Sequence, residues 1–167
     1  MYNYAEVTVR RATMSEVDII KDIINEAYAP LKKQLGSTPI ALKEGLDKIS
    51  RHIQMGNVYV ALLGDQVVGT MRASLRGKTG VIARVAVRSK FRGRRIGTVL
   101  VDYAENMLQH MGATCIEIDV YGIIENQLNF YIKHGYVKVG TGESEGEPIV
   151  IMRKELCAAE EPEDEFS

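Results

Sequence analysis

A basic segment that contains two glycines, RSKFRGRRIG (residues 88–97), holds the residue types best suited to binding an anion. It lies between an apolar stretch, IARVAV (82–87), and a long run of apolar residues at helical spacing. The start of a helix exposes unpaired N–H groups and the positive end of the helix dipole, and Gly93 and Gly97 would let an anion approach the backbone closely. Three arginines beside these glycines add positive charge: Arg92, Arg94 and Arg95. The segment therefore predicts a site for a phosphate or diphosphate group.

Two other interpretations of this segment stay open. It could be a solvated basic turn between a strand and a helix, or residues 84–95 could form a local nucleic-acid site. A nucleic-acid site would be expected to carry more aromatic side chains than Phe91 alone. The known nucleotide loops fit poorly, because no lysine precedes Thr98 as in a P-loop and the glycine pattern of a Rossmann fold is absent.

The sequence RGRRIG (92–97) resembles the acyl-CoA signature of the GNAT N-acetyltransferase superfamily, [QR]-x-x-G-x-[GA]. The first and last positions match, but Arg95 stands where the family has its middle glycine. This replacement has two interpretations: either the backbone needs no left-handed conformation at this position, or the arginine side chain adds a phosphate contact of its own.

A second segment, FYIKHGY (130–136), resembles the family pattern [FL]-Y-x-K-x-G-[FY]. The family has an asparagine seven residues before the first tyrosine of this pattern, which is Tyr131 here. Ile124 occupies the position of that asparagine. Asn126 is the nearest amide, and we expect it either to serve at the cofactor site or to cap the helix. The order of predicted elements resembles the family from about residue 6 to residue 156.

The resemblance implies an acetyl-CoA-dependent N-acetyltransferase that moves an acetyl group to a primary amine, on a small molecule or a peptide. Transfer would be direct, in a ternary complex without an acyl-enzyme. The residues themselves also indicate no nucleophile for an acyl-enzyme. Cys115 lies in a predicted strand, and no histidine is near it in sequence to activate it. The alternative is a catalytically silent acyl-CoA-binding sensor or interaction module.

The resemblance also implies which residues bind the cofactor. The strand before the signature splays from its neighbour in this family, so that its backbone can pair with the pantetheine arm. The diphosphate would take N–H groups at the helix start and arginine side chains. The implied cofactor residues are Val85, Ala86, Val87, Arg92, Gly93, Arg94, Arg95, Ile96, Gly97, Thr98 and Asn126.

Tyr131 matches the family's proton donor to the departing sulfur, although it also fits as a half-buried packing residue. A phenol with a pKa of about 10 is a weaker acid than a thiol at about 8.5, so we expect a hydrogen bond to the sulfur more than a full proton transfer. Glu117 and Asp119 share one face of a predicted strand and are candidates for the general base, with a solvated strand edge as the alternative. By resemblance, Glu26 and Tyr28 would line the acceptor side.

The elements that must position these residues follow from periodicity. Strands are predicted at 7–10, 58–63, 66–75, 79–87, 114–120, 136–140 and 148–156. Helices are predicted at 14–29, 39–56, 96–111 and 125–134, the first opened by a capping box of Thr13 and Glu16, and residues 30–40 are expected to form a loop. We expect an α+β fold of the GNAT type, a mixed, mainly antiparallel central sheet flanked by helices on both faces.

The composition and charge of the chain limit the kinds of binding partner that we expect. The net charge of −1 over 167 residues argues against a general nucleic-acid-binding surface. Two cysteines make neither a disulfide framework nor a zinc set, so no metal is expected. Without a signal peptide or membrane span, we expect a cytoplasmic protein with no nucleic-acid or membrane partner. A single domain is predicted over 1–157 with an acidic, disordered tail at 158–167. Homodimers occur in the family, so a second copy is a candidate partner.

Overall fold

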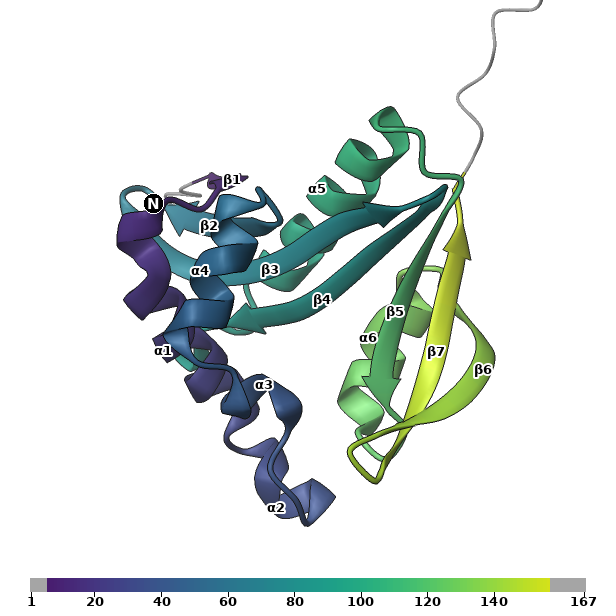
Figure 1. Ribbon diagram of the computed structural model, residues 1–167. Coiled ribbons are helices and arrows are strands. Elements are labelled where there is room, and N and C mark those ends of the chain that lie inside the picture. Colours follow the sequence, from purple (N-terminus) through teal and green to yellow (C-terminus); the bar gives the residue numbers. More distant parts are fainter. Residues whose placement is uncertain (1–5, 157–167) are drawn as a thin grey trace, which may run out of the picture.

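The computed structural model describes residues 6–156, which form one seven-stranded sheet flanked by helices (Figure 1). The strand order is β1-β2-β3-β4-β5-β7-β6, and neighbours are antiparallel except for the pair β4 and β5. The strands are β1 (Val7–Arg11), β2 (Val58–Leu63), β3 (Gln66–Arg76), β4 (Thr79–Val87), β5 (Cys115–Tyr121), β6 (Val137–Ser144) and β7 (Glu147–Glu155). This confirms the predicted α+β fold with a mixed, mainly antiparallel sheet.

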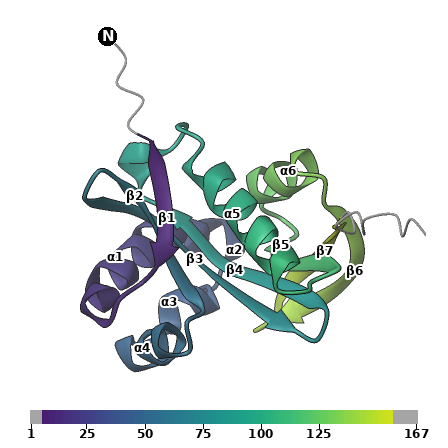
Figure 2. The same ribbon diagram turned by 90° about the horizontal axis from the view of Figure 1, so that it is seen from above.

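Helices cover both faces of the sheet. The α-helices are α1 (Val17–Tyr28), α2 (Leu31–Leu35), α3 (Ile40–Lys43), α4 (Leu46–Gln54), α5 (Ile96–His110) and α6 (Glu125–Lys133), with short 3₁₀ turns η1 (Met14–Glu16) and η2 (Ser89–Phe91). Figure 2 shows α1 and α4 on one side of the sheet and α5 and α6 on the other. Each side has its own buried apolar cluster, the first centred on Ile23 and Ile49 and the second on Leu100 and Ile116.

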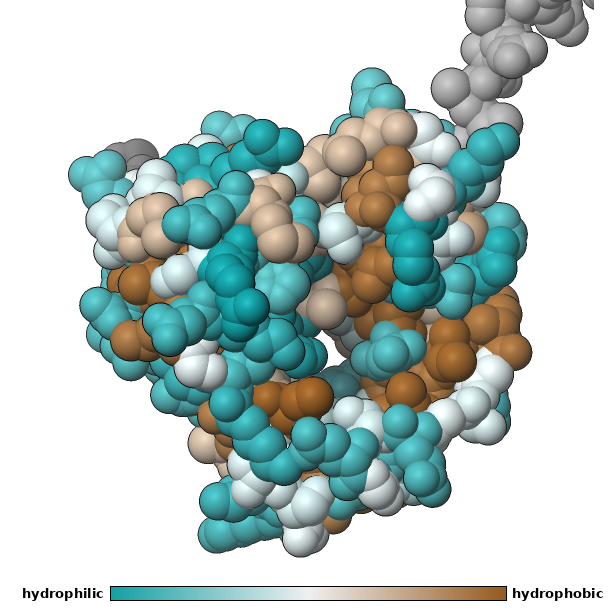
Figure 3. Space-filling model, in the orientation of Figure 1, coloured by the Kyte–Doolittle hydropathy of each residue, from teal (hydrophilic) through white to brown (hydrophobic). Residues whose placement is uncertain are grey.

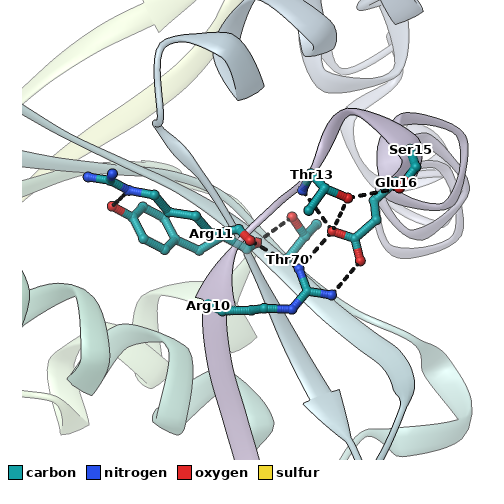
Figure 4. A network of polar contacts seen from close by, with 7 residues as sticks. Arg10, Arg11, Thr13, Ser15, Glu16 and Thr70 are labelled. Atoms are coloured by element: carbon teal, nitrogen blue, oxygen red, sulfur yellow. Dashed lines mark hydrogen bonds and ion pairs between the residues drawn. The ribbon is translucent and has the colours of Figure 1, made fainter.

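The N-terminal capping box is present as predicted (Figure 4). The backbone N–H of Thr13 donates to Oε1 of Glu16 at 2.8 Å, and the guanidinium of Arg10 donates to both carboxylate oxygens of Glu16 at 2.8 Å each. The Arg10 hydrogen bonds, against some burial, lower the pKa of Glu16 to about 2. The helix, however, begins as the 3₁₀ turn η1 before continuing as α1.

The second predicted helix, 39–56, is wrong as one continuous element. It is divided into α3 and α4, because Glu44 adopts an extended backbone (φ −71°, ψ 124°) and its buried carboxylate accepts hydrogen bonds from Arg72 and Arg84. The segment before it, expected to be loop throughout, forms the short helix α2. In both places tertiary contacts outweigh local preference.

The two halves of the sheet separate between β4 and β5. These strands pair only from Thr79–Val81 to Cys115–Glu117, and beyond that point they diverge (Figure 1). The antiparallel register of β4 against β3 also shifts, because Thr70 pairs with Ala86 whereas Arg72 pairs with Ala83, so β4 carries one extra residue. This bulge turns the end of β4 away from β5 and opens the sheet at its centre.

The acidic tail predicted at 158–167, its boundary and Cys157 lie outside the described residues. Within residues 6–156, no helix is both long and apolar enough to cross a membrane. No cluster of three or more histidine, cysteine or acidic side chains in this part of the chain is arranged to hold a metal ion.

Candidate active site

A cavity of about 730 Å³ lies where β4 and β5 diverge. Its walls come from the end of α1 and the start of α2, from the bulged half of β4, and from β5 and α6. Figure 3 shows the surface hollowed between the two halves, with hydrophobic residues gathered over the half that contains β5, β6 and β7. The residues proposed from the sequence that line it are Tyr28, Val85, Ala86, Val87, Arg92, Gly97, Asp119, Asn126 and Tyr131.

The basic loop between β4 and α5 keeps a left-handed turn at its end. Gly93 has a φ of 80° and Arg95 a φ of 62°, immediately before α5 begins. The interpretation that this position needs no left-handed backbone is therefore wrong, since the arginine adopts the conformation that a glycine would take at less cost. The exposed side chain of Arg95 is the feature that distinguishes this loop from the family signature.

The start of α5 leaves backbone N–H groups free at the end of the cavity. The first hydrogen bond that joins the loop to the helix runs from the N–H of Val99 to the carbonyl of Arg95 at 3.0 Å. The amides before Val99, from Ile96 to Thr98, therefore have no helical acceptor. The Ile96 side chain is buried in the core and holds the helix start in place.

Five of the proposed cofactor residues lie beside the cavity without lining it: Gly93, Arg94, Arg95, Ile96 and Thr98. The first three are exposed, and the guanidinium of Arg94 lies 5.4 Å from the ring centre of Phe91. This cation–π contact holds one arginine at the loop surface.

Tyr131 reaches the cavity from α6 and is 7% exposed. Its ring packs edge-on against Phe130 and Tyr136, with ring centres 5.0 and 5.6 Å away. Among the described residues, no hydrogen-bond partner is found for its hydroxyl. Burial, with a smaller contribution from Tyr28, raises the pKa of Tyr131, so the phenol keeps its proton and acts as a hydrogen-bond donor.

Tyr28 faces Tyr131 from the end of α1. Its hydroxyl donates to the backbone carbonyl of Val85 at 3.4 Å, on the diverging part of β4. Burial raises the pKa of Tyr28 to about 12. The α1 helix is thereby attached to the strand whose backbone was expected to bind the pantetheine arm.

Glu117 and Asp119 lie on the same face of β5, as predicted. Both line a second cavity of about 190 Å³, and Asp119 also lines the main cavity. Burial, followed by repulsion from Glu117, raises the pKa of Asp119. Asp119 therefore stands at the boundary between the two cavities and is a stronger proton acceptor than an ordinary aspartate.

Asn126 lines the main cavity at the start of α6. The helix has Ile124 at its N-cap position and no side-chain hydrogen bond there. The interpretation of Asn126 as a helix cap is therefore wrong, and the residue lies in the first turn of α6 beside the cavity.

The family model for the acetyltransferase (GNAT) domain matches residues 54–138, about half of the chain. The chain belongs to the GNAT acetyltransferase family. The matched region runs from the end of α4 to the start of β6, so it includes the splayed strand, the basic loop and Tyr131. No curated protein matches the chain in sequence.

Solved structures with the same fold cover nearly all of this GNAT chain. The PaiA N-acetyltransferase from Thermoplasma acidophilum, in complex with coenzyme A, has a TM-score of 0.76 at 15% identity and covers 90% of this chain and 99% of its own. The ribosomal-protein-S18-alanine N-acetyltransferase from Escherichia coli has a TM-score of 0.75 at 13% identity, with 94% and 98% covered. Ard1 from Thermoplasma volcanium has a TM-score of 0.70 at 18% identity, with 90% and 98% covered. At these identities the similarity shows the fold.

Glu26, expected on the acceptor side of the GNAT site, does not line either cavity. Its carboxylate accepts hydrogen bonds from the backbone N–H and the hydroxyl of Ser89, both at 2.7 Å, and from Arg88 at 3.1 Å. The hydrogen bonds from Ser89 lower the pKa of Glu26. The residue thus connects α1 to the start of the basic loop.

A buried ion cluster behind β4 was not found from the sequence. Glu44 is 4% exposed, and Arg72 donates to both of its carboxylate oxygens at 2.8 Å while Nε of Arg84 donates to one of them at 2.9 Å. Burial alone would raise the pKa of Glu44, but these hydrogen bonds outweigh it and hold the pKa at about 2. Arg84 is the bulge residue with a φ of 53°, so the cluster holds the strained part of β4 in this GNAT domain.

Proposed function

We propose that this chain is an acetyl-CoA-dependent N-acetyltransferase that transfers the acetyl group directly to a primary amine in a ternary complex. The observation that carries the proposal is the cavity between β4 and β5, which extends from the start of α5 to Tyr131 and has Asp119 on its wall. It brings an anion-binding helix end, a free strand edge, a hydrogen-bond donor and a carboxylate into one continuous space.

The diphosphate of the cofactor would bind at the start of α5. The free amides from Ile96 to Thr98 and the positive end of the helix dipole favour an anion there. Arg92, with Arg94 or Arg95, would add positive charge, and Gly93 and Gly97 would let the phosphates approach the backbone. The pantetheine arm would then follow the backbone of residues 85–87, where β4 has left β5.

In the transfer step, the neutral amine attacks the thioester carbonyl, a C–N bond forms, and the C–S bond then breaks. The hydroxyl of Tyr131 would donate a hydrogen bond to the departing sulfur. Because burial raises the pKa of Tyr131, stabilisation of the thiolate by this hydrogen bond is favoured over full transfer of the phenol proton.

The attacking amine must lose protons before and after the attack. A lysine-like amine has a pKa of about 10.4, so a nearby base increases the neutral fraction at neutral pH. Asp119 lies on the wall of the main cavity and has a raised pKa, and Glu117 lies behind it. Asp119 is therefore the preferred base in this proposal.

The experiment is to incubate the protein with acetyl-CoA and a panel of primary amines and to follow release of the free thiol, with calorimetry of CoA binding alongside. Binding of CoA with thiol release that depends on one class of amine supports the proposal. Binding of CoA without amine-dependent thiol release would instead support the silent sensor, and absence of CoA binding would remove both.

A further inference from the structure

The second cavity adjoins the main cavity and shares five lining residues with it: Tyr28, Ala83, Arg84, Asp119 and Gln127. We call this space of about 190 Å³ the side chamber. Its remaining walls come from the start of α3, the end of β3, the middle of β4, β5 and the β6–β7 hairpin. An acceptor whose amine reaches the thioester in the main cavity would place the rest of its atoms in the side chamber.

Arg84 belongs to a cluster in which positive charges outnumber negative ones. A single carboxylate, that of Glu44, pairs with two largely buried guanidiniums, and Lys48 approaches it at 3.3 Å as a third cation. Only Nε of Arg84 contacts Glu44, and both carboxylate oxygens already accept from Arg72. The two terminal nitrogens of Arg84 have no partner among the described residues, so this part of the wall can bind an anion in the bidentate way that arginine favours.

The backbone at Arg84 supports the same interpretation. Its φ of 53° is an unusual, strained conformation for a residue with a side chain. The bulge and the bond to Glu44 keep the guanidinium on the shared wall, with the side chain 20% exposed.

The side chamber also carries acidic groups. Glu117 and Asp119 project from β5, and Asp119 borders both cavities, as Arg84 does. The chamber thus offers an acidic group for an amine and a cationic group for a carboxylate. Arg76 also lines the chamber and lies near enough to Asp119 to oppose the rise in its pKa.

The far side of the chamber is bridged. The hydroxyl of Ser37 donates to Glu147 at 2.5 Å, and Lys43 forms an ion pair with Glu145, so the α2–α3 segment is attached to the β6–β7 hairpin. Ile40 and Ser144, beside these contacts, line the chamber. These contacts join the segments that flank the chamber, and its volume of about 190 Å³ fits a small acceptor.

We propose that the side chamber selects a small acceptor that carries both a primary amine and a carboxylate, an amino-acid-like molecule whose carboxylate binds the terminal nitrogens of Arg84. The amine would lie beside Asp119 at the boundary with the main cavity. Arg84 makes no covalent contribution, and the acetyl transfer itself is the one described above, so this inference rests on the proposed function for its chemistry.

The main experiment uses the unmodified protein and matched acceptors: the free amino acids, their carboxamides and the corresponding decarboxylated amines. Thiol release from acetyl-CoA gives kcat/KM for each. We expect the carboxylate form of the preferred acceptor to exceed its carboxamide by about 10- to 100-fold, the range of a charge-assisted bidentate pair. Equal rates for the two forms would overturn the proposal.

The variants Arg84→Gln and Arg84→Lys test the residue, with Arg51→Gln at an exposed position of α4 as the matched control. We expect Arg84→Gln to raise KM for the carboxylate acceptor while the carboxamide is unaffected, and Arg84→Lys to restore part of the preference. A fall in kcat that is equal for all acceptors would overturn the assignment and leave Arg84 only as a support of the β4 bulge. Circular dichroism on each variant shows whether its secondary structure is kept when a partner of Glu44 is replaced.

Calorimetry in the presence of CoA separates this inference from the proposed function. If acceptor binding requires the carboxylate but no acceptor gives thiol release, carboxylate recognition in the side chamber is supported and the proposed acetyltransferase activity is overturned. Acetylation of amines regardless of the carboxylate would support the enzyme while overturning the chamber. Neither thiol release nor carboxylate-dependent binding would overturn both.

Discussion

The two ends of the active-site cleft are built in different ways. The cofactor end is one continuous segment, the basic loop of residues 88–98, whose properties come from a helix start and its neighbouring side chains. The acceptor end brings together α1, the α2–α3 segment, β3, β5 and the β6–β7 hairpin, and it is supported by an ion cluster with partners 28 and 40 residues apart. The proposed cofactor site is therefore local in sequence, whereas the proposed selection of the acceptor depends on tertiary structure.

The largest effect should come from the support of the acceptor end. We expect Glu44→Gln to lower the free energy of unfolding by about 3–5 kcal/mol, because it leaves two largely buried guanidiniums without their carboxylate. Urea unfolding measures this change. The matched control is Glu143→Gln on the exposed strand β6, which should change stability by less than about 0.5 kcal/mol.

The same variant has a pH signature. The folded pKa of Glu44 is about 2 against an ordinary 4.5, so its stabilisation is present above pH 4.5 and is lost as the pH falls toward 2. Glu44→Gln should therefore remove part of the acid sensitivity of the wild-type protein. If the two proteins lose stability in parallel over this pH range, the cluster does not support the bulge as we infer.

The next largest effect is expected on kcat, from a change at Tyr131, which lies between the two ends of the cleft. Tyr131→Phe should lower kcat by about 10- to 100-fold with little change in KM for acetyl-CoA, because the hydrogen bond to sulfur matters mainly in the transition state. Steady-state kinetics measure both. The control is Tyr136→Phe, which removes the hydrogen bond of 2.9 Å that the Tyr136 hydroxyl donates to Glu105. This variant should lower the free energy of unfolding and leave kcat unchanged. Equal losses of kcat in both variants would make Tyr131 a packing residue.

The fold was largely predictable because its periodicity is local. The hairpin of β2 and β3, the long helix α5 and the capping box of Thr13 and Glu16 each follow from spacing within one segment, and all are present. The break at Glu44 was not predictable, because the helical stripe continues through it and only Arg72 and Arg84, far away in sequence, give its carboxylate a buried partner.

The same distinction between local and tertiary information applies to the candidate site. Arg92, Gly97 and Tyr131 line the cavity where the motifs predicted, since those motifs describe short segments. Arg84 could have been noticed only as a charge within an otherwise apolar strand, and nothing in its neighbours indicates a bulge or a left-handed backbone. Glu26 was assigned to the acceptor by its position late in α1, but its partner Ser89 is known only from the fold.

A smaller effect should test the cofactor end. In Gly97→Ala the added Cβ would meet the Phe130 ring at 3.5 Å, an ordinary contact, so the fold should be kept. We expect the Kd for CoA to rise about 10-fold, because the methyl group keeps the phosphate from the free amides of α5. Gly140→Ala in β6 is the matched control, since its Cβ meets Ile151 at 3.6 Å, far from the loop in the fold. Calorimetry that finds the same Kd for both variants would remove the diphosphate from this helix start.

The smallest effect is a shift in a pH profile, and it tests whether the acidic residues of β5 supply the base. A base must be deprotonated to act, so kcat at saturating acceptor should fall as the pH drops through the raised pKa of Asp119. Glu117→Gln removes the like charge that helps to raise this pKa, and the acidic limb should therefore move to lower pH by less than about one unit. Asp119→Asn should abolish the limb, with Asp65→Asn in the exposed β2–β3 turn as its control. A limb that stays in place in both Glu117→Gln and Asp119→Asn would mean that the proton leaves by another route, and the acidic groups of the side chamber would then bind the amine without activating it.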